Sequence, residues 1–152
     1  MELICPILVF NMDKIQLRPL TAIDTVIIHH TPGGKYQDAE EIHQVHLCNG
    51  WAGIGYNYLI KYNGVIEKCR LNTMVGAHCS GHNYNSLGIA LTGNFETEEP
   101  SKAQKTALSE LITLLKDSFP KIRTINGHNA FNATACPGRF LDEYCKEAGI
   151  YE

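Results

Sequence analysis

The sequence contains seven histidines and six cysteines among 152 residues, a large supply of nitrogen and sulfur ligands. His29 ends an apolar run, and His128 and Cys136 lie close together near the other end of the chain. Zn²⁺ accepts both imidazole and thiolate, and three protein ligands leave one coordination position open, as in catalytic zinc sites. These three residues, called the His-His-Cys trio below, are therefore a candidate catalytic metal site. Ligands this far apart in a sequence are less specific than a CxxC pair, so the assignment depends on the fold.

Most of the other histidines and cysteines have simpler explanations. His43 and His46 form an HxxH pair on one face of an expected helix, but no HExxH pattern provides an adjacent base, so we expect both to be structural. His82 fits an exposed loop and a binding groove equally well. The cysteines have irregular spacing, and we expect most of them to be reduced and buried. No function is assigned to Cys5, Cys48, Cys69, Cys79 and Cys145.

A buried strand is expected to position the first ligand of the trio. The β-branched run from Val26 to His30 lies between Asp24 and a turn signal at residues 31–34. Side chains alternate along a strand, so His29 and His30 point to opposite faces and only one of them can reach a given metal.

A helix is expected to follow this strand. Asp38 can cap it, and Ile42, Val45 and His46 recur at helical spacing before Asn49-Gly50 provides a stop signal. Cys48 can extend the same spacing.

Strands and helices alternate through the rest of the chain. A hairpin is expected around the Asn63-Gly64 turn, and the clearest helix begins at Ser101 and is stopped by Pro120. The expected elements are strands at residues 56–62, 65–68, 87–91 and 122–126 and helices at residues 101–119 and 139–148. This alternation predicts a single α/β domain whose central, mostly mixed sheet is flanked by helices.

Composition restricts the possible partners. The chain is 44% hydrophobic and 19% charged, with a net charge of -3, which argues against electrostatic binding to nucleic acid or to an anionic membrane. No apolar run approaches the roughly 20 residues that span a bilayer. Met1 to Phe10 lacks the basic residues of a signal peptide. We therefore expect a monomer that binds neither nucleic acid nor membrane and is synthesised in the cytoplasm without a signal peptide.

Several motifs resemble the type 2 N-acetylmuramoyl-L-alanine amidases, a family that shares its fold with animal peptidoglycan recognition proteins and a phage lysozyme-amidase. The first two are IDTVIIHHT at residues 23–31 and GWAGIGYNY at residues 50–58. The later ones, in the same order as in the family, are residues 76–78, 81–83, 85–89, 93–95, 127–128 and 134–138. The resemblance covers residues 23–141, and several motifs in the correct order are more specific than any one of them.

The resemblance implies a role for individual residues. His29, His128 and Cys136 would bind one zinc ion, and Tyr56 matches the catalytic tyrosine of the family. Thr134 matches a position that is lysine in some members and threonine in others. Thr92 stands where some branches carry a glutamate base. Family members that only bind peptidoglycan have lost the cysteine ligand, which this chain retains.

The middle motifs imply a substrate groove. His78 is expected on the substrate side, and Asn83 and Asn94 can offer amide groups to a peptide or sugar, although turn formation explains these asparagines equally well. Trp51 and Tyr58 are expected in the core. Proton transfer to the leaving amine could involve the metal-bound group, Tyr56 or His78.

The implied function is zinc-dependent hydrolysis of the amide bond between N-acetylmuramic acid and L-alanine in peptidoglycan. Residues 1–22 would be an N-terminal extension that adds a strand, and residues 23–152 the catalytic domain. A phage or prophage lysin, acting on the cell wall after release through a pore, is the expected biological role. The alternatives are a peptidoglycan-binding module without catalysis and a cytoplasmic amidase that recycles wall fragments.

Overall fold

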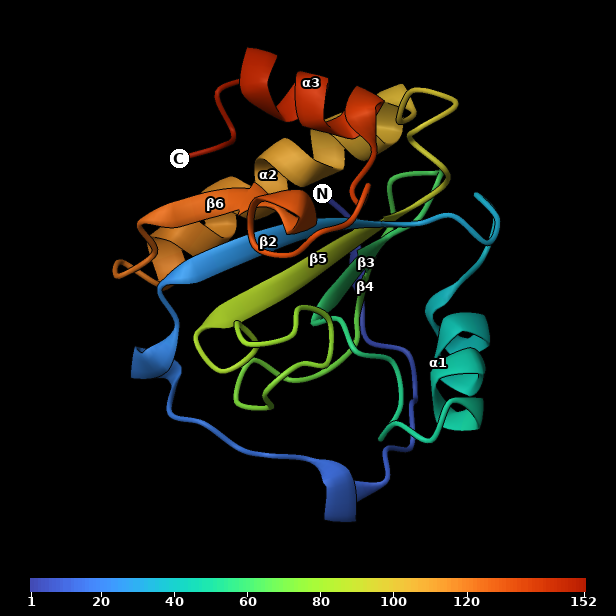
Figure 1. Cartoon of the computed structure of the whole chain (residues 1–152), viewed down its shortest axis with the longest axis vertical. Helices are drawn as coiled ribbons and strands as arrows, with labels where there is room; N and C mark the ends of the chain where they lie inside the picture. Colours follow the sequence, from blue (N-terminus) through green and yellow to red (C-terminus); the bar gives the residue numbers. More distant parts are fainter.

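A six-stranded sheet with the order β1-β4-β3-β5-β2-β6 runs through the computed structural model of the chain, which describes residues 1–152 (Figure 1). All neighbouring strands are parallel except β3 and β4, which form the antiparallel hairpin around Asn63-Gly64. The mixed sheet and the hairpin are therefore confirmed. The strands are β1 (Leu3–Ile4), β2 (Thr25–Thr31), β3 (Tyr58–Ile60), β4 (Ile66–Lys68), β5 (Ser86–Thr92) and β6 (Thr124–Gly127).

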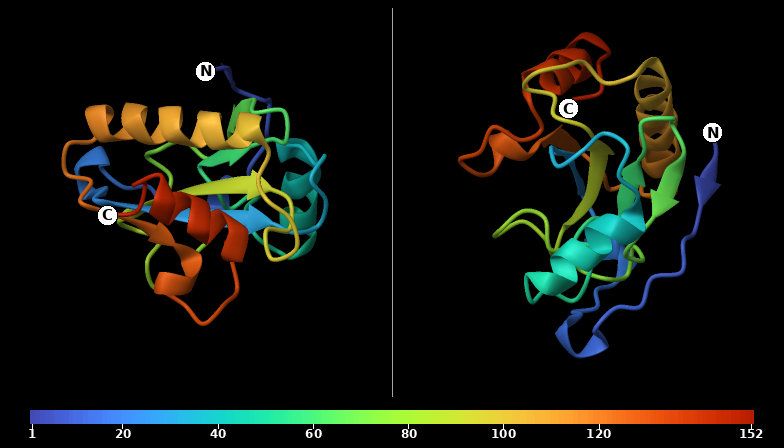
Figure 2. Two further views of the ribbon diagram at one scale, coloured as in Figure 1. Left: turned by 90° about the horizontal axis from the view of Figure 1, so that it is seen from above. Right: turned by 90° about the vertical axis from the view of Figure 1, so that its right-hand side faces the viewer.

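Helices cover both faces of this sheet (Figure 2). Helices α2 (Lys102–Ser118) and α3 (Arg139–Glu147) pack on one face, where Leu108, Leu111 and Leu141 join the larger apolar cluster. Helix α1 (Ala39–Cys48) packs on the other face over a smaller cluster. Short 3₁₀ helices lie at Met12–Lys14, Leu20–Ala22 and His128–Ala130. None of the helices combines the length and apolar character required to cross a membrane.

The ends of α1 and α2 follow from their capping residues. The Asp38 carboxylate accepts a hydrogen bond from Glu41 N, and Ser101 and Gln104 form a reciprocal capping box at the start of α2. Both predicted starts are confirmed.

Helical spacing alone does not define the buried face of α1, because Val45 is 51% exposed. The buried residues are Ala39, Ile42 and His43. His43 takes an apolar position because both of its ring nitrogens are satisfied: Nδ1 accepts from Ile54 N at 2.9 Å, and Nε2 lies 2.9 Å from the Val9 carbonyl.

The first 22 residues lie along one side of the molecule and are tied to it by specific contacts. β1 is the edge strand of the sheet and pairs with β4. The guanidinium of Arg18 is 4% exposed and donates to the backbone carbonyls of four residues, Asn72, Asn83, Tyr84 and Ser86. These bonds connect the N-terminal segment to the long loop before β5.

Candidate active site

Parallel pairing of β2 with β6 brings the trio together. Ile28 is opposite Gly127 in the register, so the following residues, His29 and His128, lie side by side at the carboxyl ends of their strands. The loop after the short helix at His128–Ala130 returns Cys136 to the same place. One potential ligand atom from each of these three residues lies within 4.8 Å of the other two.

The donor set fits a tetrahedral zinc ion. His29 Nδ1 lies 3.6 Å from Cys136 Sγ. Ligands about 2.0 and 2.3 Å from Zn²⁺ at a tetrahedral angle are about 3.5 Å apart, so these two atoms already have the required spacing. Two imidazoles and one thiolate leave the fourth position open.

Each histidine of the trio has a hydrogen-bond partner at its Nε2 atom. His29 Nε2 lies 2.8 Å from His78 Nδ1, and His128 Nε2 lies 3.0 Å from Asn132 Oδ1. The Nδ1 atoms of both ligands therefore remain available to a metal. Asn132 was not identified from the sequence, and its only signal there is its position four residues after His128.

Burial changes the proton affinity of two residues of the trio, His29 and Cys136. It lowers the pKa of His29 well below the usual range, with further lowering by the nearby His78, His128 and His30, so this ring is a neutral ligand. Burial raises the pKa of the Cys136 thiol to about 12, although a hydrogen bond from His30 N opposes this rise. A cation that binds here must therefore displace the thiol proton.

His30 lies on the opposite face of β2, as the alternation of side chains requires. Its Nδ1 accepts from Phe95 N at 3.2 Å, while its backbone N–H points to Cys136 Sγ at 3.4 Å. It therefore supports the metal ligands without belonging to the trio.

The trio opens into a cavity of about 380 Å³, called the active-site cavity below, which Tyr56 and Thr134 also line. The Tyr56 ring lies 5.2 Å from the His29 ring, and its hydroxyl makes no hydrogen bond within the protein. Burial, followed by Cys136 and Cys69, raises the pKa of Tyr56, so its hydroxyl remains a proton-bearing donor. Thr134 lies at the exposed rim, and its Oγ1 accepts from Cys136 N at 3.2 Å.

Of the three residues expected to bind substrate, only His78 lines the active-site cavity. Asn83 Oδ1 accepts from His78 N and Cys79 N, and Asn94 Oδ1 accepts from Glu96 N. Neither asparagine lines the active-site cavity. Both side-chain oxygens close local turns, which is the structural role that the sequence left open for these asparagines. His78 does line the cavity, but both of its ring nitrogens have partners inside the protein.

His46 lines the active-site cavity although the sequence indicated only a structural role. Its ring lies between those of Trp51 and Tyr56, with centroid distances of 4.6 and 5.8 Å, and Nδ1 accepts from Gly55 N at 3.0 Å. Burial, followed by the charges of Arg70 and His43, lowers the pKa of His46 to about 4. Trp51, expected in the core, is 43% exposed and lines the same cavity.

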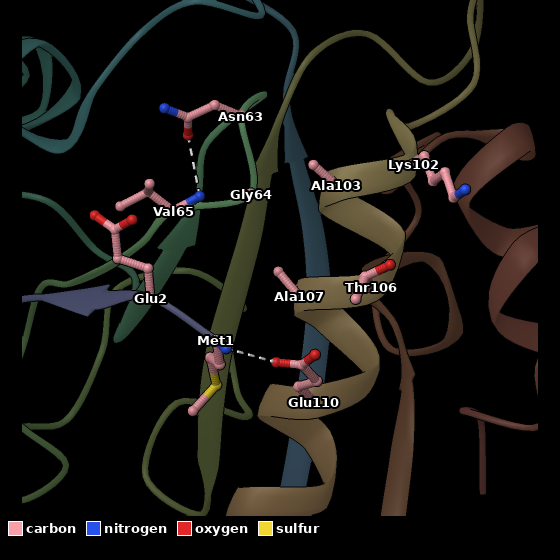
Figure 3. A pocket seen from close by; sticks show the side chains of 10 residues that line it. All are labelled: Met1, Glu2, Asn63, Gly64, Val65, Lys102, Ala103, Thr106, Ala107 and Glu110. Atoms are coloured by element: carbon pink, nitrogen blue, oxygen red, sulfur yellow. Dashed lines mark hydrogen bonds and ion pairs between the residues drawn. The ribbon is translucent and has the colours of Figure 1, made fainter.

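A larger cavity of about 550 Å³ lies away from this site, between the N-terminus, the β3–β4 hairpin and α2 (Figure 3). The amino group of Met1 pairs there with the Glu110 carboxylate at 3.1 Å. This cavity contains no histidine or cysteine and shares no lining residue with the active-site cavity. The groups capable of metal chemistry are therefore concentrated at the trio.

The chain is similar to known proteins over most of its length. Residues 19–139 match the family described as N-acetylmuramoyl-L-alanine amidase. The endolysin of Enterobacteria phage T3 is 29% identical over 133 residues, covering 83% of this chain and 87% of the relative. Peptidoglycan-recognition protein SC2 of Drosophila melanogaster is 33% identical over 127 residues, covering 74% and 66%. The structure of the N-acetylmuramoyl-L-alanine amidase LysC from Clostridium intestinale superimposes with a TM-score of 0.86 at 26% identity and covers 98% of both chains.

Proposed function

Because the chain belongs to the N-acetylmuramoyl-L-alanine amidase family, we propose that it uses zinc to hydrolyse the amide bond between N-acetylmuramic acid and the L-alanine of the peptidoglycan stem peptide. The observation that carries this proposal is the presence of the His-His-Cys trio and Tyr56 in one cavity. The trio would hold the ion through the Nδ1 atoms of His29 and His128 and the sulfur of Cys136.

The protein side chains would divide the catalytic work. Zinc bound here would polarise the amide carbonyl and activate a water molecule near neutral pH. Tyr56 would donate its hydroxyl hydrogen to the negative charge that develops on the carbonyl oxygen, because no protein group competes for that hydroxyl. Thr134 would hold the loop that carries Cys136, because its Oγ1 accepts a hydrogen bond from the Cys136 backbone N–H. Its side chain would also lie near the carbonyl oxygen of the bound substrate.

No carboxylate lines the active-site cavity. Thr92, at the position where some family branches carry glutamate, is fully buried and donates to the Lys35 carbonyl at 2.8 Å. We therefore assign no general base to that position. The proton for the leaving amine would come from water or from Tyr56.

A lysin is the biological role that the relatives favour, since several of them are phage endolysins. In this role the protein would be made in the cytoplasm and would act on the cell wall after release through a pore. The similarity to peptidoglycan recognition proteins keeps a binding module as the second candidate. Retention of Cys136 and Tyr56 favours the enzyme, because a binding module requires neither a complete ligand set nor an oxyanion donor.

The test is to incubate the zinc-loaded protein with purified sacculi and with soluble anhydro-muropeptides, in parallel, and to identify the products by mass spectrometry. We expect stem peptides with a free L-alanine amine, preferential release from sacculi, and loss of release with a chelator. Preferential cleavage of the soluble fragments would support the recycling role instead. Binding to muropeptide without release of peptide would refute the catalytic proposal.

A further inference from the structure

A chain of hydrogen bonds extends from His29 through His78, which lines the active-site cavity, to the fully buried Ser86. His29 Nε2 lies 2.8 Å from His78 Nδ1, and His78 Nε2 lies 3.3 Å from Ser86 Oγ. The hydroxyl of Ser86 in turn lies 2.7 Å from the backbone carbonyl of His82. Ser86 is fully buried, so no water competes for these bonds at that end of the chain.

The His82 carbonyl at the far end determines which atom donates and which accepts in every one of these hydrogen bonds. A carbonyl oxygen only accepts, so the Ser86 hydroxyl must donate to His82 O. The Ser86 oxygen can then accept from His78 Nε2–H, which leaves His78 Nδ1 without a proton. His78 Nδ1 therefore accepts from His29 Nε2–H, and the lone pair of His29 is on Nδ1, the atom that faces Cys136.

Two glycines make room for the His78 ring. A Cβ atom at Gly76 or at Gly88 would lie 2.6 Å from His78 Cδ2, closer than real Cβ contacts allow. Neither glycine has a positive φ, so the backbone does not require glycine at these positions. Gly88 lies in the middle of β5, where glycine weakens a strand, and the space for His78 accounts for its presence.

The face of β5 below this ring is built from small residues. Ser86, Gly88 and Ala90 alternate along the strand and so lie on one face, and Ala90 is opposite His29 in the β2–β5 register. The hydrogen-bond chain and the glycine pocket are thus parts of one arrangement behind the first metal ligand.

We propose that His78 and Ser86 are positioning residues that hold His29 in the tautomer and orientation needed to bind the metal through Nδ1. This inference rests on the proposed function only in requiring that the trio binds zinc. In this role His78 acts on the reaction through His29. Outer partners of this kind typically change metal affinity by about 10 to 100-fold when they are removed.

The test compares zinc dissociation constants, measured by competition with a chromophoric chelator, across matched variants. His78→Phe keeps a ring but removes the acceptor, and we expect zinc binding to weaken about 10 to 100-fold. His78→Gln retains an oxygen that can accept from His29, so it should recover part of this loss. His82→Phe is the control, because the His82 ring makes no hydrogen bond and packs against Phe131. Its zinc affinity should equal that of the unmodified protein.

A second measurement does not depend on whether the variants fold. Nitrogen NMR of the unmodified, metal-free protein should show His29 protonated at Nε2 and unprotonated at Nδ1. Protonation at Nδ1, or unchanged zinc affinity in a folded His78→Phe protein, would overturn the inference. Reduced peptide release with unchanged zinc affinity would also overturn it and would favour a substrate contact for His78.

The two proposals can fail separately. If the unmodified protein binds zinc and the His78 variants bind it more weakly, but no stem peptide is released from sacculi, the positioning role stands and the amidase proposal fails. If peptide is released and zinc affinity does not respond to His78, the amidase proposal stands and the positioning role fails.

Discussion

Replacing Tyr56 by phenylalanine isolates the contribution of one hydroxyl group to catalysis. The Tyr56 ring packs beside His29 and His46, with centroid distances of 5.2 and 5.8 Å, and phenylalanine preserves this packing. The hydroxyl has no hydrogen-bond partner in the protein, so its removal leaves no buried donor or acceptor unpaired. The free energy of unfolding should therefore change by less than about 0.5 kcal/mol.

The loss should appear almost entirely in the transition state. Removing one donor to a developing oxyanion typically costs about 100 to 1,000-fold in kcat, or about 2.7 to 4 kcal/mol. Because burial raises the pKa of Tyr56, the hydroxyl carries its proton throughout the neutral range, and we expect the same ratio of rates across that range. Zinc content should not change, since the trio is intact.

The assay measures initial rates of stem-peptide release by zinc-loaded protein, with zinc content determined on the same samples. Tyr58→Phe is a matched control, because the Tyr58 hydroxyl binds Asn72 Oδ1 at 3.1 Å and the residue does not line the active-site cavity. That variant should lose some stability and little turnover. Turnover of Tyr56→Phe within about tenfold of the unmodified protein would refute the oxyanion role, which predicts at least about 100-fold, and loss of zinc would show that Tyr56 supports the metal instead.

Three further perturbations test the metal site, the half-buried His46 and the N-terminal segment. Cys136→Ser should lose stoichiometric zinc on dialysis and at least about 100-fold in peptide release, because a hydroxyl is a poor zinc ligand; retention of both would contradict the trio. Burial lowers the pKa of His46 to about 4, against about 6.5 in the unfolded chain, so the unfolded state takes up the proton first and the metal-free protein loses stability as the pH falls through this window. In urea unfolding, the free energy of unfolding should fall less between about pH 7 and about pH 5 in His46→Gln than in the unmodified protein, by about 1 kcal/mol after allowance for partial exposure. An equal fall in both proteins would contradict the lowered pKa of His46. Arg18→Met should lower the free energy of unfolding by about 3 kcal/mol or more, since four carbonyls lose their donor. Arg123 is exposed, so Arg123→Met should change the free energy of unfolding by less than about 1 kcal/mol. If both arginine variants changed it equally, Arg18 would not anchor the N-terminal segment.

The elements around the trio could be predicted from the sequence because each has a local physical signature. Val26 to His30 is a β-branched run that a buried strand requires, and the observed β2 is one residue longer at each end. Ser101 and Pro120 bracket α2 because capping and the missing proline N–H act over a few residues. Alternation along β2 then separates His29 from His30 without any knowledge of the tertiary structure.

Long-range pairing is the part that local patterns cannot provide. Nothing in the sequence of β6 indicates that it lies next to β2, yet this pairing is what places His128 beside His29. The buried face of α1 depends on tertiary contacts for a related reason. His43 is buried because segments outside the helix satisfy both of its ring nitrogens, and the helical spacing does not show those partners.

The glycine in β5 shows where additional information was present in the sequence. Gly88 interrupts a run of strand-forming residues, and a strand glycine without a positive φ indicates that another group approaches the backbone closely. That group is His78, whose Cδ2 atom would lie only 2.6 Å from a Cβ at this position. A histidine motif and a strand glycine a short distance apart are each ambiguous, but together they indicate a ring packed against the sheet. An imidazole so packed can hold a metal ligand in position.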